Sequence, residues 1–368
     1  MQEKVSIIKI TAIKKQKYED NLRKTDKICI IWLKLVHIKR QYQLTKQSKT
    51  TLKTIHNGGY FMRIGILTTV EKEENERLVE AAQQRGHEAE LLYHIKCSVG
   101  VCQDKPEVYY EGKPISQDFD LIIPRIDTPH PDYGLTILTQ FLSMHIFASE
   151  NARNIEVARD KLRTAQRFLK ENVPFPSTGF AYSKEDFDNI IQTVGGVPLI
   201  IKLIEGTEGV GVFLADDMKH AVNLLKTFKQ LSKPLIVQKF IEESSGQDIR
   251  VFVAGGKVLA SMQRIATDDD FRANVSQGAR SKSVELSDLE KEISIKAAEA
   301  LGLNIAGVDI VRSKTGPLVL EVNASMDFCG KWGLEDVSGV DVAGAIIDYA
   351  VQAKRTAHKD MVLFKEAI

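Results

Sequence analysis

The sequence contains little cysteine and no long apolar run. Its 368 residues include 4 cysteines, too few and too scattered for a disulfide framework. The Cys97 and Cys102 pair has no second pair with which to complete a zinc site. No apolar stretch approaches the ~20 residues that a membrane-spanning helix needs, and the N-terminal part lacks the pattern of a secretory signal. We therefore expect a soluble, cytoplasmic protein with no membrane partner.

Several catalytic motifs are also missing. There is no Gly-x-Ser-x-Gly elbow and no serine–histidine–carboxylate pattern, which argues against a hydrolase. The 8 histidines show no metal-ligand spacing. The turn after the first predicted strand lacks the Gly-x-Gly-x-x-Gly fingerprint, so we predict no dinucleotide site there.

The net charge of +1 conceals an uneven distribution. Residues 1–61 hold 14 Lys and Arg against 4 Asp and Glu, whereas residues 62–368 hold 36 against 45. An acidic body is unsuited to wrapping nucleic acid, whose phosphates require clustered basic side chains. Met62 opens an apolar segment that is typical of the first strand of a domain. We interpret residues 1–61 as a basic extension that need not be folded and has no role, and we keep a nucleic-acid-binding arm as the alternative.

From Met62 onward, strand and helix periods alternate and predict an N-terminal α/β unit followed by α+β units. The first unit is predicted to contain strands at 63–69, 88–93 and 120–125, a helix at 73–85, and a hairpin around 111–112. The later units are predicted to contain helices at 155–171, 217–231, 287–301 and 341–354, strands at 199–203, 210–214 and 235–241, and hairpins pairing 250–254 with 257–263 and 305–312 with 318–323. The fold class expected from this order is α+β.

The last predicted hairpin carries polar side chains on otherwise apolar strands. Glu321 and Asn323 are two residues apart, so they point to the same face of their strand. Strand pairing can bring Asp309 to that face, where a buried carboxylate is costly unless it is paired or bound to metal. Two carboxylates and an amide oxygen are hard ligands suited to Mg²⁺ or Mn²⁺. The alternative is a half-buried hairpin whose polar face meets solvent.

Two further segments have the composition of an anion-binding site. Lys202 ends a strand and is followed by a glycine-rich segment up to residue 211, whose backbone N–H groups can approach phosphate oxygens. The alternative is a flexible hairpin loop. Four arginines lie within a short stretch further on, and their guanidinium groups suit carboxylate and phosphate capture unless they are solvated surface residues. These arginines are Arg250, Arg264, Arg272 and Arg280.

From Met62 to about Lys354, the chain resembles the RimK-type glutamate ligases of the ATP-grasp superfamily. Many motifs occur in the order typical of that family, which makes the resemblance specific. They are Ile-Pro-Arg-Ile at 123–126, Ala-Arg-Asp-Lys-Leu-Arg at 158–163, Val-Gly-Gly-Val-Pro at 194–198, the segment 202–211, Val-Gln at 237–238, Asp-Ile-Arg at 248–250, Asp-Phe-Arg-Ala-Asn at 270–274, Ala-Gly-Val-Asp-Ile at 306–310 and Glu-Val-Asn-Ala-Ser at 321–325.

The resemblance implies an ATP-grasp fold, in which a small α/β domain precedes two α+β lobes that clamp ATP between their sheets. The implied divisions are an extension at 1–61, a pre-ATP-grasp domain at 62–150, lobe A at 151–241, lobe B with the metal site at 242–356, and a tail at 357–368. Family members often assemble as tetramers, so a homo-oligomer is expected.

The resemblance also implies roles for individual residues. Within the ATP site, Lys161 and Lys202 would contact the phosphates, residues 239–240 would meet adenine and Asp248 would hold the ribose. The full set of residues implied to bind ATP is Lys161, Lys202, Gly206, Gly209, Lys239, Phe240, Asp248, Arg272, Ala273 and Asn274. Two Mg²⁺ or Mn²⁺ ions would be held by Asp309, Glu321 and Asn323. Arg264 and Arg272 are the candidate catalytic residues, because the reaction develops negative charge on oxygen.

The reaction implied by the resemblance joins L-glutamate to the C-terminal carboxylate of a protein through an acylphosphate, with release of ADP and phosphate. The best known acceptor in the family is the small-subunit ribosomal protein numbered six. One alternative is a ligase that acts on a small-molecule or cofactor carboxylate. The other is a nucleotide-binding, ribosome-associated regulator without turnover, against which the intact metal set argues.

Three positions depart from the family pattern. Met326-Asp327-Phe328 stands where Pro-Gly-Leu is usual, next to the predicted metal ligands. Residues 276–279 replace a His-Arg-Gly-Gly segment and lose a positive charge, for which Arg280 is a candidate replacement. Lys239 stands where an acidic residue is common, although backbone contacts to adenine do not depend on it.

Overall fold

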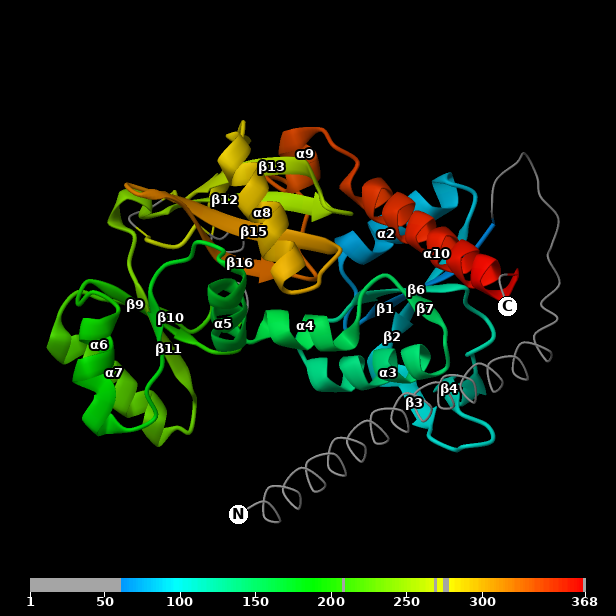
Figure 1. Cartoon of the computed structure of the whole chain (residues 1–368), viewed down its shortest axis with the longest axis horizontal. Coiled ribbons are helices and arrows are strands. Elements are labelled where there is room, and N and C mark those ends of the chain that lie inside the picture. The colour runs from blue at the N-terminus through cyan, green and yellow to red at the C-terminus, as the bar shows by residue number, and fades with distance from the viewer. Residues whose placement is uncertain (1–60, 207–208, 268–269, 274–277, 367–368) are drawn as a thin grey trace, which may run out of the picture. The chain divides into compact units, whose positions relative to one another are not determined.

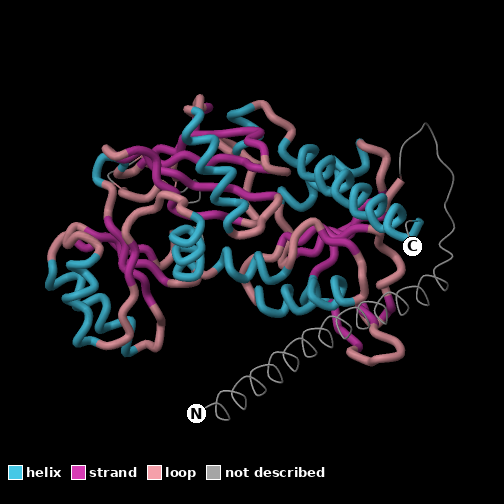
Figure 2. The backbone as a smooth tube through the Cα atoms, viewed as in Figure 1, coloured by secondary structure: helices cyan, strands magenta, loops and turns pink. Residues whose placement is uncertain are grey.

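The computed structural model describes residues 61–206, 209–267, 270–273 and 278–366, with side chains up to residue 358. This part of the chain forms four β-sheets with helices packed against them (Figures 1 and 2). Within the same ranges, no helix combines the length and the apolar character that a bilayer crossing demands. The predicted extension falls almost wholly outside the described residues.

The first sheet is parallel and has the strand order β2-β1-β6-β7. Its strands are β1 (Arg63–Thr68), β2 (Glu88–Tyr93), β6 (Leu121–Arg125) and β7 (Phe147–Ala148), and its helices are α2 (Glu73–Gln84) and α3 (Pro131–Ser143). Every residue of β6 is buried, as expected for a central strand of a parallel sheet. A 3₁₀ turn, η1 (His94–Lys96), leads to a small antiparallel sheet of β3 (Cys97–Gly100), β4 (Glu107–Tyr110) and β5 (Lys113–Pro114).

The helix predicted at 155–171 is in fact two helices, so that prediction is wrong. Helix α4 (Ala152–Arg159) ends at Asp160, and α5 (Lys161–Glu171) begins directly after it. Asp160 has an extended backbone, and its carboxylate accepts the N–H groups of Leu162 and Arg163 at 2.9 Å each. An aspartate in this position is a favourable N-cap, which outweighs continuation of the helix. The break places Arg159 and Lys161 on either side of a bend.

Residues 178–239 form a separate unit, which we call the small lobe. Its antiparallel sheet has the order β10-β9-β11-β8. The strands are β8 (Thr178–Gly179), β9 (Leu199–Leu203), β10 (Val212–Ala215) and β11 (Leu235–Lys239), accompanied by η2 (Lys184–Asp186), α6 (Phe187–Thr193) and α7 (Met218–Gln230). β10 begins two residues later than predicted, because Gly211 has a positive φ of 75° that strand geometry does not allow.

A five-stranded antiparallel sheet with the order β14-β13-β12-β15-β16 follows the small lobe. After the turn η3 (Glu242–Ser244), the strands are β12 (Gln247–Ala254), β13 (Lys257–Ile265), β14 (Arg280–Ser283), β15 (Ile305–Ser313) and β16 (Gly316–Asn323), and the helices are α8 (Asp288–Ala300), α9 (Leu334–Ser338) and α10 (Val342–Glu366). Both predicted hairpins are confirmed. α10 lies beside α2 (Figure 1) and continues 12 residues past its predicted end at 354, because no glycine or proline stops it there.

The small lobe has a hydrophobic core of its own. That core contains buried side chains between Phe187 and Val237 only. The parallel sheet and the five-stranded sheet instead share their cores, in which side chains of α2 and β1 pack with those of β12, β13 and α10. The helices α4 and α5 also contribute to a shared core, through Ile155 and Phe168.

Glu150 joins the end of β7 to the start of β15. One carboxylate oxygen accepts the N–H groups of Asn304 and Ile305 at 2.8 and 2.7 Å. The other oxygen is buried and has no hydrogen-bond partner within the described chain. Burial therefore raises the pKa of Glu150 to about 8.

We expect Glu150→Gln to flatten the pH dependence of stability. Because the folded pKa lies above the unfolded one, Glu150 contributes most below the unfolded pKa, and this contribution is lost as pH rises toward the folded pKa of about 8. Glutamine keeps one oxygen acceptor and does not ionise. The free energy of unfolding of the variant relative to wild type should therefore rise by on the order of 3 kcal/mol between pH 5 and pH 8. Urea unfolding at several pH values measures this difference in free energy, with exposed Glu156→Gln as the control. If the difference between Glu150→Gln and wild type stays constant with pH, the prediction is wrong.

Candidate active site

A cavity of about 580 Å³ lies between the small lobe and the five-stranded sheet and reaches the ends of β6 and α4. The structure brings every described residue of the predicted site to its wall. These residues are Lys161, Lys202, Gly206, Gly209, Lys239, Phe240, Asp248, Arg264, Arg272, Ala273, Asp309, Glu321 and Asn323. Asn274 lies outside the described residues. The individual roles assigned to these residues stay predictions.

The predicted metal ligands meet on one face of the β15–β16 hairpin. Asp309 and Glu321 are directly opposite each other, and a bulge follows Asp309 in the pairing. The amide nitrogen of Asn323 is 3.4 Å from a carboxylate oxygen of Asp309. The alternation of polar and apolar residues therefore predicted the shared face correctly.

Asp309 also forms ion pairs with two arginines, which lie on the strands β12 and β13. Arg250 on β12 donates to both carboxylate oxygens at 2.9 Å, and Arg264 on β13 approaches one of them at 3.0 Å. Arg264 also binds both oxygens of Asp248 at 2.6 Å. Burial disfavours the charged form of Asp309, but the two guanidinium groups outweigh it and lower its pKa to about 2. Asp309 is therefore ionised at every physiological pH.

The side chains on this hairpin fit a hard divalent cation. Asp309 supplies a permanently ionised carboxylate, and the carboxylate of Glu321 accepts no hydrogen bond from the described residues. Within those residues no three His, Cys, Asp or Glu side chains form a metal-binding group, so a further protein ligand would be an amide or carbonyl oxygen such as that of Asn323, beside water or phosphate oxygens. An all-oxygen set of this kind suits Mg²⁺ rather than zinc.

Two lysines approach the cavity from the small-lobe side. Lys161 opens α5 and donates to the carbonyl of Gly206 at 2.8 Å. Lys202 is the next-to-last residue of β9 and donates to the side chain of Gln238 on β11 at 2.7 Å. Desolvation lowers the pKa of Lys202 to about 8, and the nearby charge of Lys161 lowers it further while Glu321 opposes the shift. Lys161 and Lys202 thus supply positive charge to the same cavity as the carboxylates of Asp309 and Glu321, as binding of a polyphosphate with its metal ions would require.

The pKa of Lys202 predicts a pH dependence of ATP binding. A lysine whose pKa is lowered to about 8 is charged below that pH and loses its charge above it. If ATP requires the ammonium form, the dissociation constant should rise about tenfold between pH 7 and pH 9. We expect Lys202→Arg, which keeps its charge, to remove most of this rise. Titration calorimetry with ATP and Mg²⁺ checks it; an identical pH profile in wild type and variant excludes Lys202 as the titrating group.

The glycine-rich segment and Arg272 lie next to each other. Gly209 has a φ of 77°, a conformation that favours glycine. Its carbonyl accepts from Arg272 at 3.4 Å. Arg272 also forms a bidentate ion pair with Asp270, with nitrogen–oxygen distances of 3.1 and 2.8 Å. Arg272 is thus tied to the edge of the segment that is predicted to cover the phosphates.

The predicted adenine end lies where β11 leaves the small lobe. The N–H of Lys239 donates to the carbonyl of Ser177 at 2.9 Å. The ring of Phe240 stands edge-on to Phe271, with 6.4 Å between ring centroids. Phe240 and Phe271 both line the cavity and give this end an apolar surface suited to a flat base.

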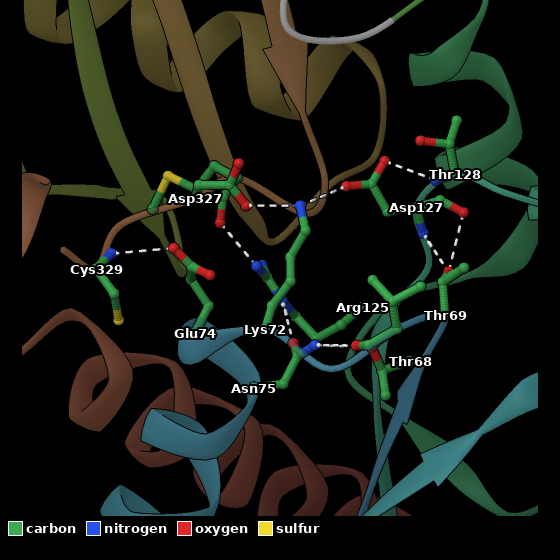
Figure 3. Close-up of polar contacts among 12 residues, drawn as sticks. Thr68, Thr69, Lys72, Glu74, Asn75, Arg125, Asp127, Thr128, Asp327 and Cys329 are labelled. Atoms are coloured by element: carbon green, nitrogen blue, oxygen red, sulfur yellow. Dashed lines mark hydrogen bonds and ion pairs between the residues drawn. The ribbon is translucent and has the colours of Figure 1, made fainter. Parts of the chain in front are cut away.

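A second group of charged residues lines the cavity and was missed from the sequence. Lys72 donates to Asp127 and to Asp327 at 3.2 Å each (Figure 3), and Arg159 lies 4.0 Å from Asp127. Lys72 and Asp127 gave no signal in the sequence. Arg159 belongs to a motif of the resemblance, and Asp327 lies in the segment that departs from the family pattern, so both could have been flagged.

Similar folds occur in solved ATP-grasp structures. The RimK domain ATP-grasp protein of Sphaerobacter thermophilus matches with a TM-score of 0.59 at 23% identity, covering 78% of this chain and 99% of that one. The ATP-grasp ligase PsnB, complexed with minimal precursor, Mg and ADP, matches with a TM-score of 0.62 at 19% identity, covering 79% and 97%. The predicted α+β ATP-grasp fold is confirmed.

Sequence comparison identifies the family within this fold. The RimK pre-ATP-grasp domain model matches residues 62–155, and the RimK-like ATP-grasp domain model matches residues 158–350. A probable alpha-L-glutamate ligase of Coxiella burnetii (strain RSA 493 / Nine Mile phase I) is 45% identical over 289 residues, which cover 78% of this chain and 95% of the relative. The chain belongs to the RimK-like ATP-grasp family. It is accordingly an ATP-dependent carboxylate–amine ligase, as the sequence predicted.

Proposed function

We propose that this ligase joins L-glutamate to the C-terminal carboxylate of a protein or peptide and releases ADP and phosphate. One observation carries the proposal: a single cavity holds Lys161 and Lys202 opposite Asp309 and Glu321. At about 580 Å³ it lies in the size range of small-molecule sites. The names of the curated relatives support glutamate as the amine, because they are described as probable alpha-L-glutamate ligases.

The proposed reaction has two steps. An acceptor carboxylate oxygen attacks the γ-phosphorus of ATP, the bond to ADP breaks, and an acylphosphate forms. The glutamate amine then attacks the acyl carbon, the bond to phosphate breaks with its electrons leaving on phosphate, and the amine loses a proton. Both steps place negative charge on oxygen, which Lys161, Lys202 and Arg272 are placed to stabilise.

The residues of the β15–β16 hairpin complete this assignment. Asp309, Glu321 and Asn323 would hold the divalent ions, for which we propose two Mg²⁺ or Mn²⁺. When bound, such ions neutralise phosphate charge. Arg250 and Arg264 act on this site by keeping the Asp309 carboxylate ionised and oriented. Asp248 is proposed to hold the ribose hydroxyls.

The proposed acceptor is the small-subunit ribosomal protein numbered six, as implied by the resemblance. A peptide acceptor is further supported by the neighbour PsnB, which has also been solved with its precursor peptide. The proposal includes the domain divisions given above, a cytoplasmic homo-oligomer such as a tetramer, and an extension at 1–61 without a role.

Intact-mass spectrometry tests the proposal. The ribosomal protein of the same organism is incubated with this enzyme, ATP, Mg²⁺ and L-glutamate, with Glu321→Gln in parallel. We expect additions of whole glutamate residues that are absent with the variant. An unmodified protein, together with ADP release on adding small carboxylates, would favour the small-molecule alternative instead.

A further inference from the structure

The charged group missed from the sequence occupies one end of the cavity. It consists of Lys72, Asp127, Arg159 and Asp327, which we call the charged cluster. Lys72 precedes α2, Asp127 follows β6, Arg159 ends α4 and Asp327 follows β16, so four segments distant in sequence converge there. Asp327 is only four residues after Asn323, which places the cluster next to the predicted metal ligands.

Asp127 is held in place by residues that follow strands of the parallel sheet. The hydroxyl of Thr69 donates to the carbonyl of Asp127 and accepts its N–H, both at 2.9 Å (Figure 3). The N–H of Thr128 donates to the Asp127 carboxylate at 2.8 Å. Lys72 then links this fixed carboxylate to Asp327.

The segment that carries Asp327 is also fixed on both sides. The buried guanidinium of Arg125 donates to the carbonyl of Met326 at 2.8 Å and stacks over the ring of Phe328 at 5.6 Å. A carboxylate oxygen of Glu74 accepts the N–H of Cys329 at 3.2 Å. Figure 3 shows Arg125 and the contact between Glu74 and Cys329 close to Asp327. The Asp327 side chain is therefore presented to the cavity by a rigid backbone.

Two groups of the cluster keep hydrogen-bonding capacity facing the cavity. Asp327 uses one carboxylate oxygen for Lys72, and the other accepts no hydrogen bond from the described residues. Its side chain is 45% exposed. Arg159 has one distant ion pair with Asp127 and makes no hydrogen bond within the described part of the chain, although its side chain is only 19% exposed. None of the Arg159 nitrogens is among the fully buried atoms that lack a hydrogen-bond partner in the described residues, so its guanidinium faces the cavity with donors available to a ligand.

We propose that the charged cluster is the subsite for the incoming amino acid, with Asp327 binding its ammonium group and Arg159 a carboxylate. This inference rests on the proposed function, because it concerns the amine substrate of the same reaction. A guanidinium fork binds carboxylate in a bidentate manner. Lys72 supplies a second positive charge near the carboxylates, and it fixes the orientation of Asp327.

The mixed charge of the cluster distinguishes it from the nucleotide end of the cavity. The phosphate side presents Lys161 and Lys202, and the adenine side presents Phe240 and Phe271. An amino acid with an acidic side chain carries one ammonium and two carboxylates, and the cluster offers groups of both signs within one chain of ion pairs. A bare acceptor carboxylate would require positive charge alone.

The test compares Arg159→Met and Asp327→Asn with wild type. We expect either variant to raise the KM for L-glutamate at least about tenfold, while the KM for ATP changes less than twofold. Arg153→Met is the matched control, because Arg153 is an exposed arginine on the same helix that does not line the cavity. L-glutamine is assayed alongside. If Arg159→Met changes the preference for L-glutamate over L-glutamine, Arg159 binds the side-chain carboxylate. If the KM for both amino acids rises equally, Arg159 binds the α-carboxylate.

A binding measurement separates this inference from the proposed function. Thermal shift with L-glutamate, in the presence of ADP and Mg²⁺, needs no acceptor. We expect a shift in wild type and in Arg153→Met that Arg159→Met and Asp327→Asn lose. An enzyme that forms product but keeps its KM for glutamate in both variants overturns the subsite and leaves the proposed function standing. A glutamate-dependent shift lost in the variants, without product from any protein acceptor, supports the subsite and overturns the acceptor assignment.

Discussion

Glu321→Gln should lower kcat by about a thousandfold or more, because we propose Glu321 as a metal ligand and such ligands contribute several kcal/mol to the transition state. The same change should alter the stability of the fold little, because relief of repulsion with Asp309 is offset by the lost attraction between Glu321 and Lys202. The carboxylate of Glu321 accepts no hydrogen bond from the described residues and faces the ionised Asp309 across the strand pair. Removing one of two opposed like charges relieves repulsion.

This pairing of lost activity with retained stability is the informative result. ADP release and urea unfolding are measured on the same preparations, with exposed Glu292→Gln on α8 as the control for a carboxylate-to-amide change. If Glu321→Gln instead unfolds easily, Glu321 has a structural role and the metal assignment fails. If it keeps full turnover, the reaction does not depend on this ligand.

Arg264→Met should destabilise the fold by about 3–5 kcal/mol, as removal of one partner from a buried ion pair generally does. Arg264 is 3% exposed and binds both Asp248 and Asp309. Its loss leaves two buried carboxylates with one remaining guanidinium, that of Arg250. Methionine fills a similar volume, so the cost comes from charge and not from a cavity.

The pH dependence of this variant identifies the cause. Without Arg264 the folded pKa of the two carboxylates should rise, so the deficit should shrink as pH falls and they take up protons. Urea unfolding at several pH values checks this. Arg163→Met is the control, because both members of its ion pair with Glu156 are 55% exposed and such pairs contribute little. A deficit that does not change with pH would mean that lost packing is responsible.

The elements that position the proposed metal ligands were predictable because their signal is local. Alternation of polar and apolar residues on β15 and β16 predicted the shared face of Asp309 and Glu321, and Gly255-Gly256 predicted the β12–β13 turn. Both glycines of that turn have positive φ, of 59° and 72°. A turn of this kind leaves little choice in the register of its strands.

The ion pairs around the ligands could not be predicted in the same way. The pairing of Arg250 with Asp309 depends on β12 lying next to β15, which are 59 residues apart at this contact. Lys72 and Asp327 are separated by 255 residues. Contacts over such distances follow from the packing of whole sheets. Local patterns in a single sequence carry no information about that packing. The unbroken helical pattern at 155–171 was misleading for the opposite reason, since one N-cap aspartate overrode it locally.

The separate core of the small lobe gives it the character of an inserted domain. The chain enters through β8 and leaves through β11, and these two strands pair with each other, with Thr178 opposite Gln238. The two ends of the insertion are thus adjacent. Its apolar side chains pack among themselves, while the remaining sheets share theirs. The small lobe, which carries part of the proposed nucleotide site, therefore has a hydrophobic core that is independent of the one supporting Asp309 and Glu321.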